Sequence, residues 1–302
     1  MAEELNGVII INKHKGVTSH DIVFKIRKLF NTKKVGHTGT LDPMAEGVLP
    51  VLIGRAAKAA EYLTAEDKGY VAKIQLGITT DTEDTSGNIL AKCDTLPTKN
   101  DFFEACKHFE GDIKQIPPMY SALKVNGKKL CDLAREGIEV EREARSIHIS
   151  SIIPEEVDEK AGIYRLSVNC SKGTYIRTLC ADIGSHLGCG GAMSELLRTK
   201  SGSFTLDGSY TVFELENMSY EERCKLIIPT EELFSDCERV FLPDFYSKLA
   251  KSGCEIYQSK IKTTYPVDKF VTVWDKNGFF ALGQIRQYEG GTAIKIIKLF
   301  VL

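Results

Sequence analysis

Gly36-His-Thr-Gly-Thr-Leu-Asp-Pro-Met-Ala-Glu-Gly47 is the stretch that most constrains the backbone conformation in the first part of the sequence. Its three glycines and its proline require a loop of specified backbone conformation, because glycine reaches torsion angles that other residues avoid and proline fixes its own. Asp42, directly before the proline, is either an ordinary turn residue or a nucleophile or general base held on a rigid loop. A phosphate-binding loop is disfavoured, because the patterns G-x-x-x-x-G-K-[ST] and G-x-G-x-x-G are both absent.

The segments around this loop predict alternating strands and helices. Residues 7–12 form a β-branched run that is typical of a buried strand. Thr18 followed three residues later by Asp21 is the start signal of a capped helix. Residues 31–47 are expected to form one long loop, and the alanine-rich residues 54–63 a second helix.

The middle of the chain continues this pattern. Residues 69–76 and 163–170 alternate between apolar and polar side chains and predict strands. Asn126-Gly127, flanked by apolar alternation, predicts a β-hairpin. Beyond a boundary near residues 238–243, short β-rich runs separated by turn signals predict a small β-barrel or sandwich.

The composition sets limits on the class of protein. The chain has 302 residues, of which 43% are hydrophobic and 26% charged, which excludes a disordered chain, a fibre and a small disulfide scaffold. A net charge of −2 excludes a uniformly basic coat protein. The charges are unevenly placed: residues 11–40 carry seven basic and one acidic side chain, residues 151–240 nine and fifteen, and residues 241–302 nine and five. Two basic ends around an acidic middle favour a polyanionic partner.

Cysteines, histidines and apolar runs exclude further classes of site. The nine cysteines include no C-x-x-C pair and the six histidines show no ligand spacing, so we expect neither a zinc site nor a redox motif. No window approaches 18 apolar residues, and residues 1–7 do not resemble a signal peptide. We therefore expect a protein of the reducing cytoplasm, without membrane attachment.

Two polar segments have both a structural and a functional interpretation. Residues 81–87 resemble a calcium loop but fail its spacing, so a polar turn is the better interpretation. Arg177 lies at a predicted strand-to-helix junction, away from the apolar stripe of the helix. It is either a surface arginine or a cation that keeps a catalytic carboxylate ionised and oriented.

Four blocks of sequence resemble one family. Residues 35–49, 68–70 with 76–84, 116–130 and 171–179 closely resemble, in order, motifs of the TruB family of bacterial tRNA pseudouridine-55 synthases. The resemblance spans about residues 6–203. The last 60 residues are similar, in position and β character, to the PUA-like RNA-binding module that this family carries.

The resemblance implies roles for six side chains. Asp42 occupies the place of the catalytic aspartate, and Arg177 that of the arginine that pairs with it. The remaining four are expected to bind the substrate by stacking on bases or lining the base pocket: His37, Tyr70, Tyr175 and Leu196. No metal and no cofactor are implied, because the base never leaves the site during the reaction.

The resemblance also implies a fold and an activity. The expected fold is α+β: a pseudouridine-synthase-like domain over residues 1–238, with a mixed, mainly antiparallel central sheet, and a PUA-like β-barrel over residues 239–302. The expected activity is isomerisation of uridine 55 in the T arm of tRNA, by a monomer without a protein partner. The basic residues between 13 and 34 would contact the tRNA backbone. Two alternatives stay open at this point: a non-catalytic RNA-binding or tRNA-folding protein of the same fold, and a metal-independent nucleoside hydrolase.

Overall fold

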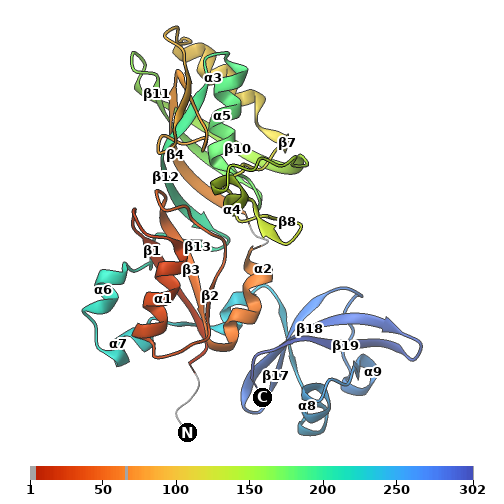
Figure 1. Ribbon diagram of the computed structural model, residues 1–302. Coiled ribbons are helices and arrows are strands. Elements are labelled where there is room, and N and C mark those ends of the chain that lie inside the picture. The colour runs from red at the N-terminus through yellow and green to blue at the C-terminus, as the bar shows by residue number, and fades with distance from the viewer. Residues whose placement is uncertain (1–4, 65–66, 302) are drawn as a thin grey trace.

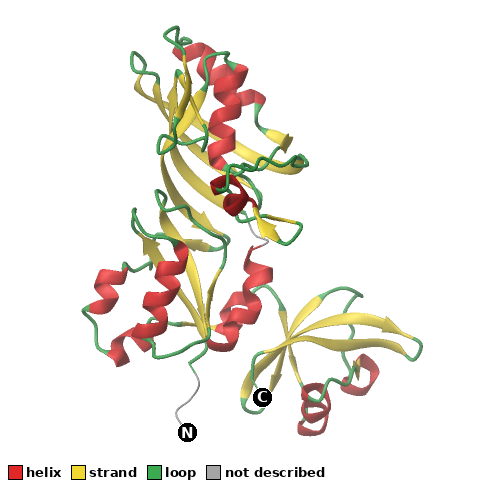
Figure 2. Ribbon diagram, in the orientation of Figure 1, coloured by secondary structure: helices red, strands yellow, loops and turns green. Residues whose placement is uncertain are grey.

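A computed structural model describes residues 5–64 and 67–301 and contains one large and one small sheet (Figures 1 and 2). The large sheet is antiparallel throughout, except where β3 and β12 run parallel. The predicted mixed, mainly antiparallel sheet is therefore confirmed. In spatial order its strands are β14 (Ile228–Pro229), β1 (Gly7–Lys13), β3 (Glu46–Ile53), β12 (Gly191–Ser201), β4 (Lys68–Leu76), β11 (Ile163–Cys170), β10 (Arg145–Asp158) and β7 (Gly111–Gln115), with β2 (Val35–His37) on β3 and β13 (Phe204–Thr205) on β12.

The parallel β3–β12 contact is a short seam between two halves of the large sheet. Only two residue pairs form it, Leu197 with Glu46 and Arg198 with Gly47. On one side lie β1, β2 and β3, and on the other β4, β11, β10 and β7. The loop that carries Asp42 thus belongs to one half, while Tyr70 on β4 belongs to the other.

Helices cover one face of each half and build the main apolar core. Helix α1 begins after Thr18, whose side chain and Asp21 form the predicted capping box, and it buries Ile22, Val23 and Ile26. Helix α5 packs against β12 and beside α3 (Figure 1). The helices and 3₁₀ segments are α1 (Ser19–Leu29), η1 (Gly54–Ala59), α2 (Ala60–Thr64), α3 (Lys99–His108), α4 (Leu130–Arg135), α5 (Ile176–His186), α6 (Val212–Glu216), α7 (Tyr220–Lys225), η2 (Thr230–Phe234), α8 (Asp244–Lys251) and α9 (Gln258–Ile261).

One local prediction is wrong, and another is confirmed except for the kind of helix at its start. The long loop expected over residues 31–47 is interrupted, because residues 35–37 pair antiparallel with residues 51–53 and add β2 to the edge of β3. The helix expected over residues 54–63 begins as a 3₁₀ segment and becomes α-helical only at Ala60. Alanine favours a helix of either kind, so composition alone does not distinguish the two.

The Asn-Gly hairpin is confirmed. Asn126 and Gly127 have φ angles of 51° and 83°, which a tight hairpin turn with two left-handed residues requires. The short strands it joins are β8 (Lys124–Val125) and β9 (Lys128–Lys129). A second small hairpin, β5 (Ile78–Thr80) with β6 (Ile89–Lys92), flanks the polar segment 81–87.

The C-terminal segment forms a separate curled sheet, a half-barrel (Figure 1). One of its faces closes over a core that includes Val240, Val271, Val273 and Ile294. Its strands, in spatial order, are β15 (Glu238–Phe241), β17 (Phe270–Asp275), β18 (Gly278–Tyr288), β19 (Gly291–Leu299) and β16 (Ile256–Tyr257).

Among residues 5–64 and 67–301, none of the helices has the length and apolar character needed to cross a bilayer.

The other face of the half-barrel packs on the rest of the protein through an aromatic cluster. Phe279 is 8% exposed and lies between Phe234 of η2 and Phe300, with ring centroids 6.5 and 5.5 Å away. Ala59 belongs to the same cluster, and Lys298 pairs with Glu61 at 2.6 Å. The C-terminal sheet is therefore fixed to helix α2 and not merely tethered to it.

Phe279→Ala should lower the free energy of unfolding by about 3–5 kcal/mol, the usual cost of deleting a buried phenylalanine side chain. Urea unfolding followed by circular dichroism measures the change. Phe245→Ala is the matched control, because that side chain is 66% exposed on α8. Equal effects of the two changes would contradict a packed aromatic contact.

Candidate active site

Asp42 and Arg177 form an ion pair at the junction of two segments distant in sequence. The Arg177 Nε lies 3.0 Å from the Asp42 Oδ2. Arg177 is in the first turn of α5 and is only 6% exposed, so the interpretation as a surface arginine is wrong. Its remaining nitrogens donate to the carbonyl oxygens of Thr82 at 3.1 Å and Tyr120 at 2.7 Å. These bonds fix the plane of the guanidinium and thereby the position of the Asp42 carboxylate.

A second carboxylate, Asp84, lies on the far side of Arg177. Its Oδ2 is 3.9 Å from the Arg177 Nη1. Its Oδ1 accepts hydrogen bonds from the Thr82 hydroxyl at 2.8 Å and from the backbone N–H of Ser86 at 2.9 Å. The polar turn over residues 81–87 is therefore confirmed as a turn, but it also contributes a charge beside Arg177. The sequence contained one sign of this, since residue 84 ends a block that resembles the family.

Burial and the neighbouring charges have opposing effects on the ionisation of Asp42. Burial raises the pKa of the Asp42 carboxyl above its ordinary value, the Arg177 charge lowers it, and the Asp84 charge raises it again. The net direction is upward. The Asp42 side chain is still 35% exposed, so a ligand can reach its carboxylate.

The buried Lys13 side chain forms hydrogen bonds to the backbone of the loop that carries Asp42. Its Nζ donates to the carbonyl oxygens of Ala45 at 2.5 Å and Pro43 at 3.5 Å. The residue is fully buried, and burial lowers the pKa of Lys13 to about 8. The expectation that Lys13 belongs to a basic contact surface is therefore wrong, because its charge faces the inside of the loop that carries Asp42.

Arg198 is a site residue that the sequence analysis missed. It is 1% exposed, and it donates from Nε to the Val48 carbonyl oxygen at 2.7 Å and from Nη2 to the Gly39 carbonyl oxygen at 3.2 Å. Gly47 makes this approach possible, since its φ is 103° and a Cβ there would lie 2.2 Å from the Arg198 carbonyl oxygen. The sequence offered no signal for this, because β12 also carries the charged residues Glu195 and Lys200, which are exposed.

Tyr70 and Tyr175 face the ion pair from two other elements. Tyr70 lies opposite Arg198 in the β4–β12 register. Burial raises the pKa of the Tyr70 phenol, while Arg198, hydrogen-bonded to it, lowers that pKa. Tyr175 precedes α5, and the buried Gln115 amide holds its backbone through two hydrogen bonds, at 2.8 Å to its N–H and 3.1 Å to its carbonyl oxygen.

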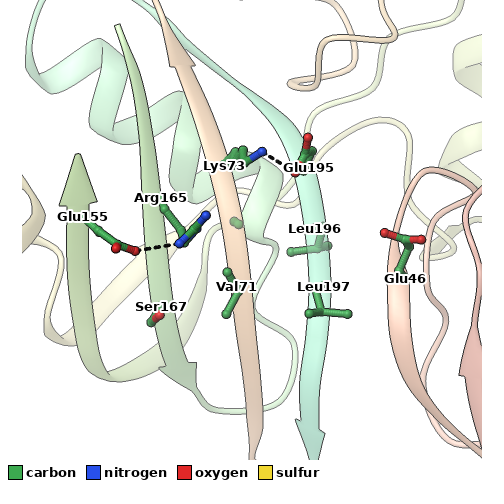
Figure 3. A pocket seen from close by; sticks show the side chains of 10 residues that line it. Glu46, Val71, Lys73, Glu155, Arg165, Ser167, Glu195, Leu196 and Leu197 are labelled. Atoms are coloured by element: carbon green, nitrogen blue, oxygen red, sulfur yellow. Dashed lines mark hydrogen bonds and ion pairs between the residues drawn. The ribbon is translucent and has the colours of Figure 1, made fainter. Parts of the chain in front are cut away.

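His37 and Leu196 lie farther from the ion pair. His37 is on β2, and its buried Nδ1 has no hydrogen-bond partner in the described part of the chain. Burial and the Arg198 charge lower the pKa of His37, which favours the neutral ring. Leu196 is 8% exposed, lies opposite Ala72 and precedes Arg198 by two residues in β12; it also lines the hollow in the large sheet (Figure 3). The structure thus brings Asp42, Tyr70, Tyr175 and Arg177 together and places the other two at the border.

The opposite face of the large sheet holds a hollow of about 490 Å³ (Figure 3). Because side chains alternate along a strand, Val71 and Lys73 point away from the face of Tyr70. Four of the charged side chains that line this hollow form two ion pairs, Lys73 with Glu195 and Arg165 with Glu155, each at 2.9 Å, and Glu46 also lines it. It shares no side chain with the Asp42 ion pair, and we assign no chemistry to it.

Among residues 5–64 and 67–301, no three His, Cys, Asp or Glu side chains are grouped to hold a metal ion.

Comparisons with known families agree on one assignment. Residues 27–176 match the N-terminal domain of TruB family pseudouridylate synthases, and residues 177–235 match the C-terminal domain of tRNA pseudouridylate synthase B. The chain is 43% identical to tRNA pseudouridine synthase B of Clostridium tetani, over 98% of this chain and 100% of that protein. It is 46% identical to the Bacillus pumilus protein of the same name, over 82% of each.

Solved structures agree with this at the level of the fold. A chain of a Cbf5–Nop10–Gar1 complex superposes with a TM-score of 0.72 at 27% identity, covering 99% of this chain and 85% of that one. A chain of an H/ACA ribonucleoprotein bound to a substrate RNA containing 2′-deoxyuridine gives a TM-score of 0.71 at 25% identity, covering 98% and 85%.

Arg177→Met should raise the pKa of Asp42 further, because burial and the Asp84 charge would then act without an opposing cation. Arg177→Lys, which keeps the charge, should raise it less. Carbon-detected NMR titration of the aspartate carboxyls measures both. Arg165→Met removes a cation from the opposite face and should leave Asp42 unaffected; a titration of Asp42 that is the same in all four proteins would refute the assigned coupling.

Proposed function

This chain belongs to the TruB family of pseudouridine synthases, and we propose that it isomerises uridine 55 in the T arm of tRNA, with Asp42 as the catalytic residue. The family membership makes it a tRNA pseudouridine synthase, an isomerase. The observation that carries the proposal for Asp42 is its ion pair with the buried Arg177, on a carboxylate that a ligand can still reach. A protein that only bound or folded tRNA would need neither the buried arginine nor an accessible carboxylate beside it.

The proposed chemistry uses the carboxylate at the ribose. The N1–C1′ bond of uridine breaks, the base turns within the site, a C5–C1′ bond forms, and the C5 proton is lost while N1 gains one. An ionised Asp42 can act as the nucleophile at C1′ or as the base toward the ribose in a glycal route, and both remain open. Arg177 favours the ionised form that either route requires.

The aromatic side chains around the ion pair fit a base that has left its helix. A paired uridine must be flipped out first, at a cost of a few kcal/mol, and stacking on Tyr70 offsets part of that cost. Tyr175 lies where the fields of Arg177 and Asp42 both reach its phenol. His37, as a neutral ring at the edge of the site, is suited to stack where bases have been extruded, and Leu196 to line the base pocket.

The remaining expectations extend the proposal beyond the active site. The exposed lysines of α1 and of the loop after it, among them Lys28 and Lys33, would contact the tRNA backbone without Lys13. We place the domain boundary at residues 238/239, just after the matched family domains end at residue 235, with a PUA-like RNA-binding module beyond it. A monomer acting in the cytoplasm without a cofactor completes the proposal, and the nine free cysteines fit that reducing compartment.

Asp42→Asn should abolish turnover and leave tRNA affinity within about threefold, because the amide has a similar shape but is a poor nucleophile and a poor base. Tritium release from tRNA labelled at uridine C5, with mapping of position 55, measures turnover. Asp112→Asn, a change at an exposed carboxylate on β7, is the matched control and should be fully active. Pseudouridine formation by Asp42→Asn within tenfold of the unmodified enzyme would assign the chemistry to another residue.

Tyr70→Phe and Tyr70→Ala should differ sharply in tRNA binding. Phenylalanine keeps the stacking face, whereas alanine loses about 1–3 kcal/mol of base contact. Turnover and affinity are measured for both variants. Slow turnover with intact binding in Tyr70→Phe would assign the phenol a role in the chemistry, and unchanged turnover would leave stacking as its sole contribution. Equal affinity of the two variants would refute the stacking role itself.

A further inference from the structure

The C-terminal half-barrel carries an exposed group of two aromatic rings and one cation. We infer that Arg239, Phe241 and Trp274 form a stacking platform for an unpaired nucleotide of RNA. The identity of that RNA as tRNA rests on the proposed function, and the platform would be a second contact for the same substrate, outside the Asp42 site.

Strand pairing places the three side chains on one face. Strands β15 and β17 run parallel, and Phe241 lies opposite Trp274. One position earlier in each strand, Val240 and Val273 point into the core of the half-barrel. Arg239 and Phe241 alternate with Val240 and therefore point outward. The Arg239 guanidinium carbon lies 4.8 Å from the centre of the Trp274 ring, and the Phe241 ring lies 5.9 Å from it at an angle of 37°.

The Trp274 end of the platform is packed against the protein, and the Phe241 end is exposed to solvent. Trp274 contacts the buried Phe279 at 5.7 Å, and Phe279 stacks on Phe300 in the cluster that fixes the half-barrel to α2. Phe241, by contrast, is 64% exposed. The Trp274 Nε1 already donates to the Thr272 hydroxyl at 3.1 Å, and Arg239 lies over the indole ring, so a base would stack on the Arg239 guanidinium and the Phe241 ring that the indole supports. A ring that is held in place before binding loses little conformational freedom when a base stacks on it.

The charge around the platform selects a polyanion. Residues 239–302 carry ten basic and five acidic side chains. The carboxylates adjacent in sequence are occupied by lysines: Glu238 by Lys269 at 2.5 Å and Asp275 by Lys251 at 2.9 Å. Arg239 has no carboxylate partner in the described part of the chain. An exposed aromatic ring beside an uncompensated guanidinium is a combination by which proteins bind single-stranded RNA.

Trp274 is the only tryptophan of the protein, so its fluorescence reports on the platform directly. The full-length enzyme is titrated with a short single-stranded RNA and with a duplex RNA of the same length. We expect the single strand to quench the emission strongly and the duplex weakly, because only unpaired bases are free to stack. Equal quenching by the two, or none by either, would overturn the platform. Emission that changes with protein concentration alone would also overturn it, because self-association would then cover the rings.

Two variants test the contribution to tRNA binding. Phe241→Ala and Arg239→Gln should weaken tRNA affinity about 5- to 150-fold, as the loss of one stacked base does, and should leave the rate at saturating tRNA unchanged. Arg286→Gln is the matched control: it removes one positive charge near the far end of the β18–β19 hairpin and should weaken binding much less (Figure 1).

The two proposals fail in different ways. If Arg286→Gln weakens binding as much as Arg239→Gln, or if Phe241→Ala has no effect, the platform is refuted, whatever the activity. If the unmodified enzyme forms no pseudouridine while single-stranded RNA still quenches Trp274, the proposed function fails and the platform stands.

Discussion

The contact on which the rest of the site depends is the ion pair between Asp42 and Arg177. An arginine that is 6% exposed is tolerated only if its donors are satisfied, because an unpaired buried charge costs several kcal/mol. Arg177 meets that demand with a carboxylate from one segment and carbonyl oxygens from two others, at Thr82 and Tyr120. One side chain therefore holds together a loop near the N-terminus, a polar turn and the start of a helix. The Asp42 carboxylate is positioned by the same bonds that make the arginine stable.

Two further buried cations, Lys13 and Arg198, donate hydrogen bonds to backbone carbonyl oxygens of the same loop. Loops usually lie at the surface, where water satisfies their carbonyl groups. Here Lys13 reaches the carbonyl oxygens after Asp42 and Arg198 reaches the one at Gly39, so both ends of the loop are bonded from inside the protein. This explains how a segment with three glycines can hold one geometry. It also ties the loop to the short β3–β12 seam, because Arg198 is part of that seam.

Periodicity and capping signals were sufficient for β1, α1, β4 and β11, but they did not predict β3, β7, β10, β12 or α3. They failed where the deciding contact is distant in sequence. The three residues of β2 are too few to show a pattern, and they are a strand only because β3 offers an open edge. Arg177 could be read as a surface residue until its partners were placed, and Arg198 gave no motif at all. Asp42 was singled out by its loop, but its role came from a resemblance; burial and neighbouring charge belong to the fold and not to the local sequence.

The narrow seam has a consequence for the order in which this protein is made. Gly39 and Arg198 are 159 residues apart in the chain, and ribosomes add about 5–20 residues per second, so the loop waits about 8 to 32 s for its inner support. The nascent chain therefore carries Asp42 without Arg177 or Arg198 for about half of its synthesis. Contacts of such large sequence separation form slowly, so the loop that carries Asp42 acquires its inner support only after residue 198 has been made.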